Sequence, residues 1–160
     1  MLDGPSVVAE LKRCGATHII WIPDSTLGCW EPAILAEPAI TLVRPCREGE
    51  AIALAGGLWL GGAHPVVIIQ CTGLFEAGDA LRNIVHDLGI PLFLIVGVRS
   101  YLAARKGPVA DNCPQFAEPI MKAWRIPFAL LDDRNSAQDL GRAYAQQRAA
   151  NKTSAVLIAE

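Results

Sequence analysis

Apolar residues along this chain gather in six short continuous runs, and the segments between the runs show helical spacing. The runs are rich in Ile, Val, Leu and Phe and lack the polar alternation of strands with one face in water. Such runs are typical of strands that helices cover on both faces. We therefore predict six strands, at residues 18–23, 40–45, 65–70, 91–98, 126–131 and 155–159.

The segments between these runs are predicted to be helices. Proline in the first turn and Gly15 as a stop signal predict a helix at 5–14. The segment 74–88 is expected to be one amphipathic helix. Its apolar stripe consists of Leu74, Leu81, Ile84, Val85 and Leu88. A short turn is expected at 30–36, and further helices are expected at 47–60, 115–124 and 136–150.

Strands that alternate with helices predict an α/β fold with right-handed crossovers. We expect a three-layer α/β/α architecture with a mostly parallel six-stranded sheet, formed by residues 1–160 as a single domain. Ligands of such sheets bind at the carboxyl ends of the strands. The segment 100–114 follows one of these ends and is expected to be an unstructured lid. Its cations, Arg105 and Lys106, either meet an acidic substrate group or are solvated surface charges, and the second is the simpler interpretation.

Composition excludes several other classes of protein. The chain has 160 residues, of which 52% are apolar and 19% charged, which excludes a disordered segment. No apolar run is long enough to cross a bilayer of about 30 Å, and the first residues lack the features of a signal peptide. A net charge of −2 without a basic stripe argues against a nucleic-acid partner. The apolar excess predicts a core together with a subunit interface.

Familiar catalytic and metal-binding motifs are missing from the sequence. It contains no GxGxxG, P-loop or GxSxG motif, and its three histidines are scattered. Five cysteines without a CxxC pair indicate reduced thiols in a cytoplasmic protein, and no metal held by this chain alone is expected. Cys71, between a predicted strand and helix, is either a nucleophile with a lowered thiol pKa or, more commonly, a small buried hydrophobe.

Two acidic residues open the predicted helix 47–60. Carboxylates in a first turn, here Glu48 and Glu50, favour the positive end of the helix dipole. The rest of this helix is apolar on all sides, which is typical of a buried helix. Side chains two positions apart point about 200° apart on a helix, so at least one of the two carboxylates faces an interior or an interface. A buried carboxylate is costly without a partner, and the pair is therefore a candidate functional site.

Four segments of the chain carry a family resemblance. They are the strand that ends in Pro23-Asp24-Ser25, the stretch from Arg47-Glu48 to Gly57, the junction Gln70-Cys71-Thr72-Gly73-Leu74, and the strand from Ile90-Pro91 to Arg99. In order and spacing they resemble the pyrimidine-binding (PYR) domain of thiamine diphosphate-dependent enzymes. Within this family they are most similar to the alpha subunit of sulfopyruvate decarboxylase and to phosphonopyruvate decarboxylases.

The resemblance implies a role for each matching residue. Glu48 would be the catalytic carboxylate that hydrogen-bonds the aminopyrimidine of thiamine diphosphate, because the family has a glycine nine positions after this residue, here Gly57. The cofactor would also contact Thr72, Gly73 and Leu74. The 2-oxo acid substrate would contact Asp24, Ser25, Gln70 and Arg99.

The family's Gly-Asp-Gly motif, which holds Mg²⁺ and the diphosphate, is absent from the sequence. The resemblance therefore implies a separate beta subunit that holds both, in a homodimer or hetero-oligomer whose alpha chain is inactive alone. Two segments depart from the family pattern: Phe75-Glu76 replaces Gly-Asn, and Pro114-Gln115-Phe116 lacks the usual histidine. A binding or assembly module that kept the fold and lost the chemistry is the alternative.

Overall fold

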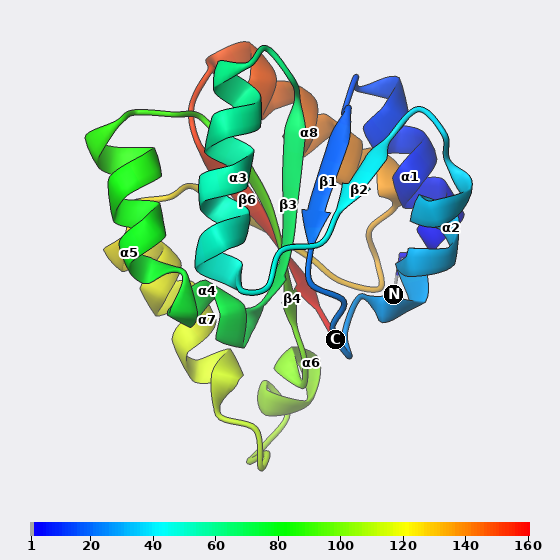
Figure 1. Ribbon diagram of the computed structural model, residues 1–160. Helices are drawn as coiled ribbons and strands as arrows, with labels where there is room; N and C mark the ends of the chain where they lie inside the picture. Colours follow the sequence, from blue (N-terminus) through cyan, green and yellow to red (C-terminus); the bar gives the residue numbers. More distant parts are fainter. Residues whose placement is uncertain (1) are drawn as a thin grey trace.

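The structure is a computed structural model that describes residues 2–160. Its centre is a six-stranded sheet in the order β2-β1-β3-β4-β6-β5, and every pairing is parallel (Figure 1). All six predicted strands are present, some shorter than expected. They are β1 (His18–Trp21), β2 (Thr41–Val43), β3 (Pro65–Gln70), β4 (Phe93–Val98), β5 (Phe128–Leu131) and β6 (Ser154–Ala159).

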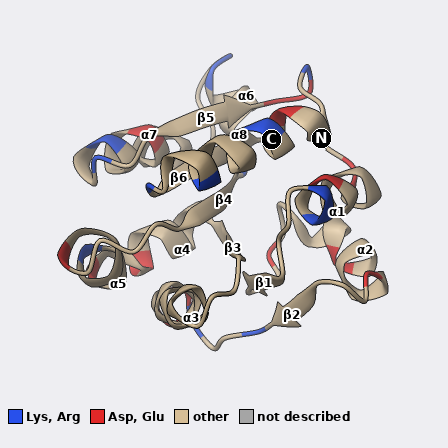
Figure 2. Ribbon diagram, turned by 90° about the horizontal axis from the view of Figure 1, so that it is seen from above, with Lys and Arg blue, Asp and Glu red and all other residues tan. Residues whose placement is uncertain are grey.

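Helices cover both faces of the sheet, which confirms the predicted three-layer α/β/α fold (Figure 2). One face is covered by α1 (Gly4–Arg13), α2 (Glu31–Ala36) and α8 (Ala137–Ala150), with the short 3-10 turn η1 (Gly28–Trp30) before α2. The other face is covered by α3 (Glu48–Leu60), α4 (Cys71–Glu76), α5 (Gly78–Leu81), the π-helical segment η2 (Arg82–Asp87) and α7 (Cys113–Ala123). Within the described residues, no helix is long and apolar enough to span a membrane.

The segment predicted as one helix at 74–88 is divided into three pieces. The first piece, α4, begins already at Cys71 and ends at Glu76. Ala77 separates it from α5, and the third piece, η2, is π-helical. A π-helical turn holds more residues than an α-helical turn, so it rotates the apolar stripe out of register. Leu74 and Leu81 are buried as predicted, but Leu88 is 64% exposed, and its assignment to the buried stripe is wrong.

The segment 100–114 also differs from the prediction. It contains the short helix α6 (Tyr101–Ala104), with Tyr101 buried against the core, and α7 begins already at Cys113. Ser100, between β4 and α6, has a positive φ of 60°, which is uncommon for a residue other than glycine. The rest of the segment projects beyond the sheet at the bottom of Figure 1.

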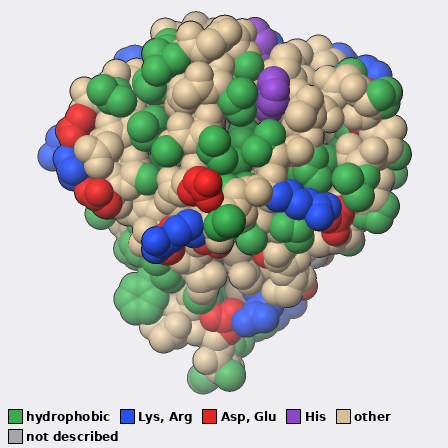
Figure 3. All heavy atoms as spheres, viewed as in Figure 1, with side chains coloured by type: hydrophobic (Ala, Val, Ile, Leu, Met, Phe, Trp, Pro, Cys, Tyr) green, Lys and Arg blue, Asp and Glu red, His purple; other side chains and the backbone are tan. Residues whose placement is uncertain are grey.

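Helix α3 is only half covered within the chain. Ile52 and Ala55 point into the core, and Gly56 permits close contact with η2, since a Cβ there would lie 2.9 Å from Cγ2 of Ile84. On the opposite side, Leu54 is 36% and Leu60 69% exposed. Figure 3 shows hydrophobic side chains scattered over this face of the molecule, with charged groups along its lower part. The all-round apolar sequence of α3 thus buries one side and leaves the other at the surface.

Candidate active site

The order of the strands locates the candidate site. β1 pairs with β2 on one side and with β3 on the other, so the chain reverses its direction of winding between β1 and β3. In open parallel sheets, ligands bind beyond the carboxyl ends of the strands at such a switch point. The residues after β1 and β3 are Pro23-Asp24-Ser25 and Cys71-Thr72-Gly73. These are two of the segments that carry the family resemblance.

Glu48 lies at the start of α3 and is half-buried against the first turn of α4. A Cβ on Gly73 would come within 2.3 Å of Glu48 Cγ and 2.5 Å of its Oε1. Real Cβ atoms do not approach other atoms so closely, so Gly73 leaves the space that the Glu48 carboxyl group occupies. The structure therefore brings together two residues that the resemblance assigned to one cofactor.

Glu50, the other acidic residue of this turn, has a different environment. Its side chain is exposed, and Oε2 accepts a hydrogen bond from the backbone N–H of Cys46 at 2.7 Å. This bond ties the backbone just before α3 to the first turn of the helix. Of the two carboxylates, it is thus Glu48 that faces the interior.

Ser25, Gln70 and Thr72 form a chain of long hydrogen bonds across the switch point. Gln70 Nε2 donates to Ser25 Oγ at 3.4 Å, and Thr72 Oγ1 donates to Gln70 Oε1 at 3.5 Å. Both distances lie beyond the usual range for strong hydrogen bonds. Weakly paired polar groups of this kind can exchange their partners for a ligand at little cost.

Asp24 is occupied by its own loop. Oδ1 accepts from the backbone N–H groups of Thr26 and Leu27 at 2.7 and 2.8 Å, and Oδ2 accepts from the indole N–H of Trp21 at 3.0 Å. These contacts shape the turn after β1 and hold Ser25 in place. The substrate contact predicted for Asp24 stays a prediction, and the geometry favours a role in organising this loop.

Arg99 lies just beyond β4, the strand next to β3. Its Nε donates to Asp111 Oδ2 at 3.3 Å, which connects the two ends of the segment that contains α6. Asp111 also accepts from the backbone N–H of Cys113 at 3.0 Å, and this bond is the main reason that the pKa of Asp111 is lowered. Half of the Arg99 side chain is exposed, so the guanidinium group can reach a ligand at this end of the sheet.

The environment of Cys71 argues against a nucleophilic thiol. The side chain is 1% exposed, and burial raises the pKa of the thiol to about 12. A nucleophilic cysteine needs a lowered pKa and access to substrate. Cys71 behaves as the small buried hydrophobe of the alternative interpretation. Leu74 is likewise fully buried, so only its backbone could reach a cofactor.

The two departures from the family pattern meet in space. The rings of Phe75 and Phe116 pack edge to face with centroids 6.2 Å apart. Next to this pair, Glu76 contacts the residues on either side of Glu48. Sequence reasoning identified Phe75-Glu76 and Phe116 only as separate departures, and nothing in the sequence alone indicated that Glu76 reaches the start of α3.

The residues present fit the aminopyrimidine end of thiamine diphosphate on one geometric ground. A carboxyl group lies at the switch point over a glycine whose Cβ would displace it. The described residues include no group of three or more His, Cys, Asp or Glu side chains arranged to hold a metal ion.

Comparison with known proteins gives three findings of relevance. No family model matches the sequence. The chain is 27% identical over 149 residues to phosphonopyruvate decarboxylase from Streptomyces viridochromogenes, covering 93% of this chain and 37% of that protein. It is 28% identical to the alpha subunit of sulfopyruvate decarboxylase from Methanothermobacter thermautotrophicus, over 59% of this chain and 57% of that subunit.

Structural comparison agrees with these similarities. A provisionally identified thiamin diphosphate-dependent enzyme from Mycobacterium smegmatis superimposes on 96% of this chain with a TM-score of 0.67, at 20% identity and over 29% of its own length. A protein from Xylella fastidiosa with the provisional name pre-16S rRNA nuclease is 29% identical over 65% of this chain and 64% of its own length. The similarity to the phosphonopyruvate decarboxylase from Streptomyces viridochromogenes spans more of the chain than this one does.

The parallel sheet and the superposition show that the chain has the fold of a thiamin diphosphate-dependent enzyme, with the Glu48 carboxyl group at the switch point of the sheet. In sequence, the chain is similar to phosphonopyruvate decarboxylases and to a sulfopyruvate decarboxylase alpha subunit. It spans about a third of the length of the first of these relatives.

Proposed function

We propose that the chain is the alpha subunit of a thiamine diphosphate-dependent decarboxylase of small 2-oxo acids, of the sulfopyruvate and phosphonopyruvate type. The single observation that carries this proposal is the Glu48 carboxyl group, held over Gly73 at the switch point of the sheet. In this proposal the diphosphate and Mg²⁺ are held by a separate beta subunit, and the complete site forms only in the assembled oligomer. The similarity to a decarboxylase subunit named alpha supports this division.

The proposed task of Glu48 is to hold a proton. When bound, thiamine diphosphate supplies the carbon nucleophile and the electron sink that decarboxylation of a 2-oxo acid needs. Glu48 Oε1 or Oε2 would share a proton with a ring nitrogen of the aminopyrimidine and so control the protonation of that ring. Ala51 and Ile52, which follow Glu48 in α3, are buried, and a low local dielectric would strengthen such a hydrogen bond.

The polar residues around Glu48 would bind and orient the substrate. Ser25 and Gln70 can donate hydrogen bonds to a carboxylate or carbonyl oxygen, because their present contacts are long. Arg99 would pair with the acidic group at the far end of a sulfonate- or phosphonate-bearing substrate, in competition with Asp111. The products would be carbon dioxide and the aldehyde one carbon shorter.

Reconstitution tests the proposal. The chain is mixed with a beta subunit of the sulfopyruvate decarboxylase type, thiamine diphosphate and Mg²⁺, and carbon dioxide release is followed with sulfopyruvate, phosphonopyruvate and pyruvate. We expect release only from the mixture, and a loss of about 100-fold or more for Glu48→Gln, in keeping with general acid–base catalysis. Glu50→Gln is the matched control on the same turn and should retain activity within about twofold.

The outcomes separate the two hypotheses. An assembled complex that binds no cofactor and releases no carbon dioxide would favour the binding or assembly module. Activity of Glu48→Gln close to that of wild type would contradict the role given to this carboxyl group. Both results are interpretable only if the variant elutes and melts like wild type, so size-exclusion and thermal-melting profiles accompany each assay.

A further inference from the structure

Helix α3 begins without a capping side chain of its own. Its N-cap residue is Arg47, whose side chain makes no capping hydrogen bond. The first N–H groups of a helix have no partner inside the helix and need acceptors from elsewhere. Arginine is a poor choice at this place because its charge has the same sign as the helix N-terminus. The turn that carries Glu48 therefore depends on outside contacts for its position.

Glu76, the last residue of α4, supplies these contacts from another part of the chain. Its Oε2 accepts a hydrogen bond from the backbone N–H of Gly49 at 2.7 Å. Its Oε1 accepts from Nε of Arg47 at 2.9 Å and forms an ion pair with the same guanidinium group at 2.6 Å. Glu76 thus binds the residue before Glu48 and the residue after it.

We infer that Glu76 is a positioning residue for Glu48. This inference rests on the proposed function, since it gives a purpose to the placement of the Glu48 carboxyl group. Gly73 and Glu76 lie three positions apart on α4 and so on the same side of this helix. Gly73 leaves room for the Glu48 side chain, and Glu76 fixes the backbone on which that side chain stands. Helix α4 thus provides the space for the Glu48 side chain and also fixes the backbone next to it.

The two contacts of Glu76 are expected to differ in how much they contribute to the position of the first turn of α3. The Arg47 side chain is 71% exposed, and exposed ion pairs contribute about 0–1 kcal/mol. The hydrogen bond to the Gly49 N–H satisfies a helix-terminal donor and places a negative charge at the positive end of α3. We therefore expect the acceptor oxygen on residue 76 to matter more than its ion pair.

Three variants separate these contributions in the assembled enzyme. Glu76→Ala removes both contacts, Glu76→Gln keeps an acceptor oxygen for Gly49, and Arg47→Ala removes the ion pair alone. Displacement of a catalytic group by about 1 Å can cost about 100-fold in rate. We expect Glu76→Ala to lower kcat by about 10- to 100-fold with a smaller change in KM, and the other two variants to stay within about threefold of wild type.

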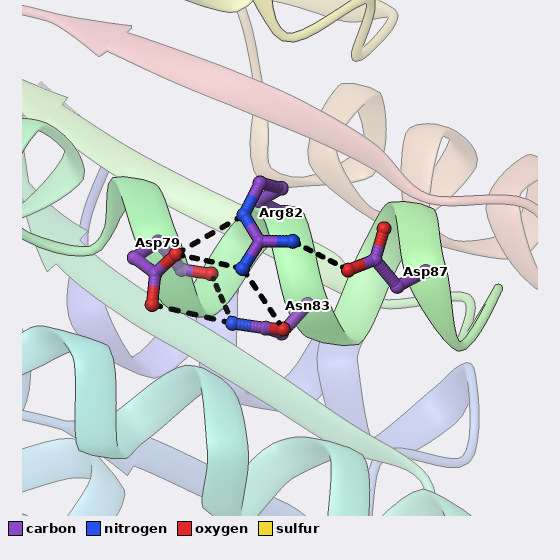
Figure 4. A network of polar contacts seen from close by, with 4 residues as sticks. All are labelled: Asp79, Arg82, Asn83 and Asp87. Carbon is purple, nitrogen blue, oxygen red and sulfur yellow. Dashed lines mark hydrogen bonds and ion pairs between the residues drawn. The ribbon is translucent and has the colours of Figure 1, made fainter.

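A matched control removes a carboxylate nearby without touching Glu48. Asp79 lies three positions after Glu76 and binds Arg82 and Asn83 in a surface network that also includes Asp87 (Figure 4). Its side chain is 80% exposed. Asp79→Ala makes the same change of charge as Glu76→Ala, and we expect it to leave kcat unchanged.

Hydrogen exchange gives a readout that needs neither cofactor nor activity. In the chain alone, Glu76→Ala should accelerate exchange of the Gly49 N–H by about tenfold or more, since a net hydrogen bond of about 1.4 kcal/mol corresponds to tenfold. Glu76→Gln should retain most of the protection. Unchanged exchange of this N–H in a folded Glu76→Ala variant would overturn the inference, as would wild-type kcat in that variant.

Two results distinguish the failure of this inference from the failure of the proposed function. If Glu48→Gln is inactive while Glu76→Ala is fully active, only the positioning role is overturned. If Glu48→Gln itself is fully active, the role of the carboxyl group is overturned, and the positioning role falls with it. A Glu76→Gln variant as impaired as Glu76→Ala would also overturn the assignment to the acceptor oxygen.

Discussion

The side-chain hydrogen bonds at the two ends of the sheet differ in length. At the amino end, Arg148 of α8 donates to the backbone oxygen of Cys14 at 2.6 Å and contacts His64 Nε2 at 3.0 Å. There Thr17 Oγ1 also accepts from the His64 N–H at 2.9 Å. At the carboxyl end, the bonds that join Gln70 to its neighbours are 3.4 and 3.5 Å long.

This difference in hydrogen-bond length indicates that polar residues at one end of the sheet serve stability and those at the other end serve binding. At the amino end, the bonds of Arg148 and Thr17, 2.6–3.0 Å long, tie α1, α8 and the start of β3 together, beside a longer bond of 3.4 Å from the Tyr144 hydroxyl group to the His64 carbonyl oxygen. At the carboxyl end, the strongest polar contacts shape backbone, as at Asp24 and Glu76, whereas Ser25 and Gln70 are only weakly paired. Side chains intended for a ligand must retain bonding capacity until that ligand arrives. The comparison therefore predicts that substitutions at one end change activity and those at the other change stability.

The largest expected effect is that of Gly73→Ala at the carboxyl end. The added Cβ would overlap Glu48 at 2.3–2.6 Å and force this side chain to move. Under the proposed function, we expect a loss of about 100-fold in kcat of the assembled enzyme, as for a misplaced catalytic group. Alanine is more favourable than glycine in a helix by about 1 kcal/mol, which offsets part of the strain from the overlap. The free energy of unfolding should therefore fall only slightly, whereas kcat falls strongly.

The matched control for this variant is Gly57→Ala in α3. A Cβ added at Gly57 would have no atom of the described residues within 4 Å of it. Because alanine is also more favourable than glycine in a helix, the substitution should raise the thermal stability of the isolated chain. Denaturant unfolding of both variants, together with the activity of Gly73→Ala, measures the contrast. Full activity of Gly73→Ala would show that Glu48 can move without consequence.

The pattern of apolar runs predicted the strands and the layers of the fold correctly. The strand at 65–70 contains four consecutive β-branched residues, 66–69, and their burial is typical of a strand that helices cover on both faces. The helix at 74–88 was predicted as continuous because periodicity does not register a π-helical turn. The exposed Leu88 is the result.

Apart from the acidic pair Glu48 and Glu50, it was the family resemblance, and no pattern of the chain itself, that selected the residues of the candidate site. Glu48 and Gly73 are far apart in the sequence, and only the resemblance assigned them to one cofactor. The contact of Glu76 with Gly49 joins positions 27 residues apart through a backbone N–H, which no sequence pattern encodes. The same holds for the packing of Phe75 on Phe116. The contacts made by residues that depart from the family pattern, such as Phe75 and Glu76, are visible only in the structure.

A smaller effect is expected for Arg148→Ala at the amino end. The variant removes the bonds from the guanidinium group to Cys14 and His64, and the group is exposed. We expect the free energy of unfolding to fall by about 1 kcal/mol, with no change in kcat per folded enzyme. Arg142→Ala on the same helix removes only a local ion pair with Asp139 and should cost about half as much or less. A lowered kcat in Arg148→Ala would break the division between the two ends.

The smallest expected effect is a pH dependence that arises at His64. Burial and, second, the Arg148 charge lower the pKa of this imidazole below its usual value of 6.5. The folded state thus binds a proton less readily than the unfolded state, so stability is present above pH 6.5 and is lost as the pH falls below this value. Thermal melting between pH 7.5 and pH 5 should show a decrease for wild type, because a protonated His64 can no longer accept from Arg148.

Replacement of the imidazole tests this assignment without removing the contact. His64→Gln retains an oxygen that can accept from Arg148 but does not titrate, so its melting temperature should decrease less on acidification. His86→Gln, which leaves the contacts of His64 with Arg148 and Thr17 intact, is the control for loss of an imidazole elsewhere in the chain. If His64→Gln and wild type lose stability in parallel, other groups are responsible for the acid sensitivity. The bond from Arg148 to the Cys14 carbonyl and the bond from the His64 N–H to Thr17 would then hold the amino end independently of pH.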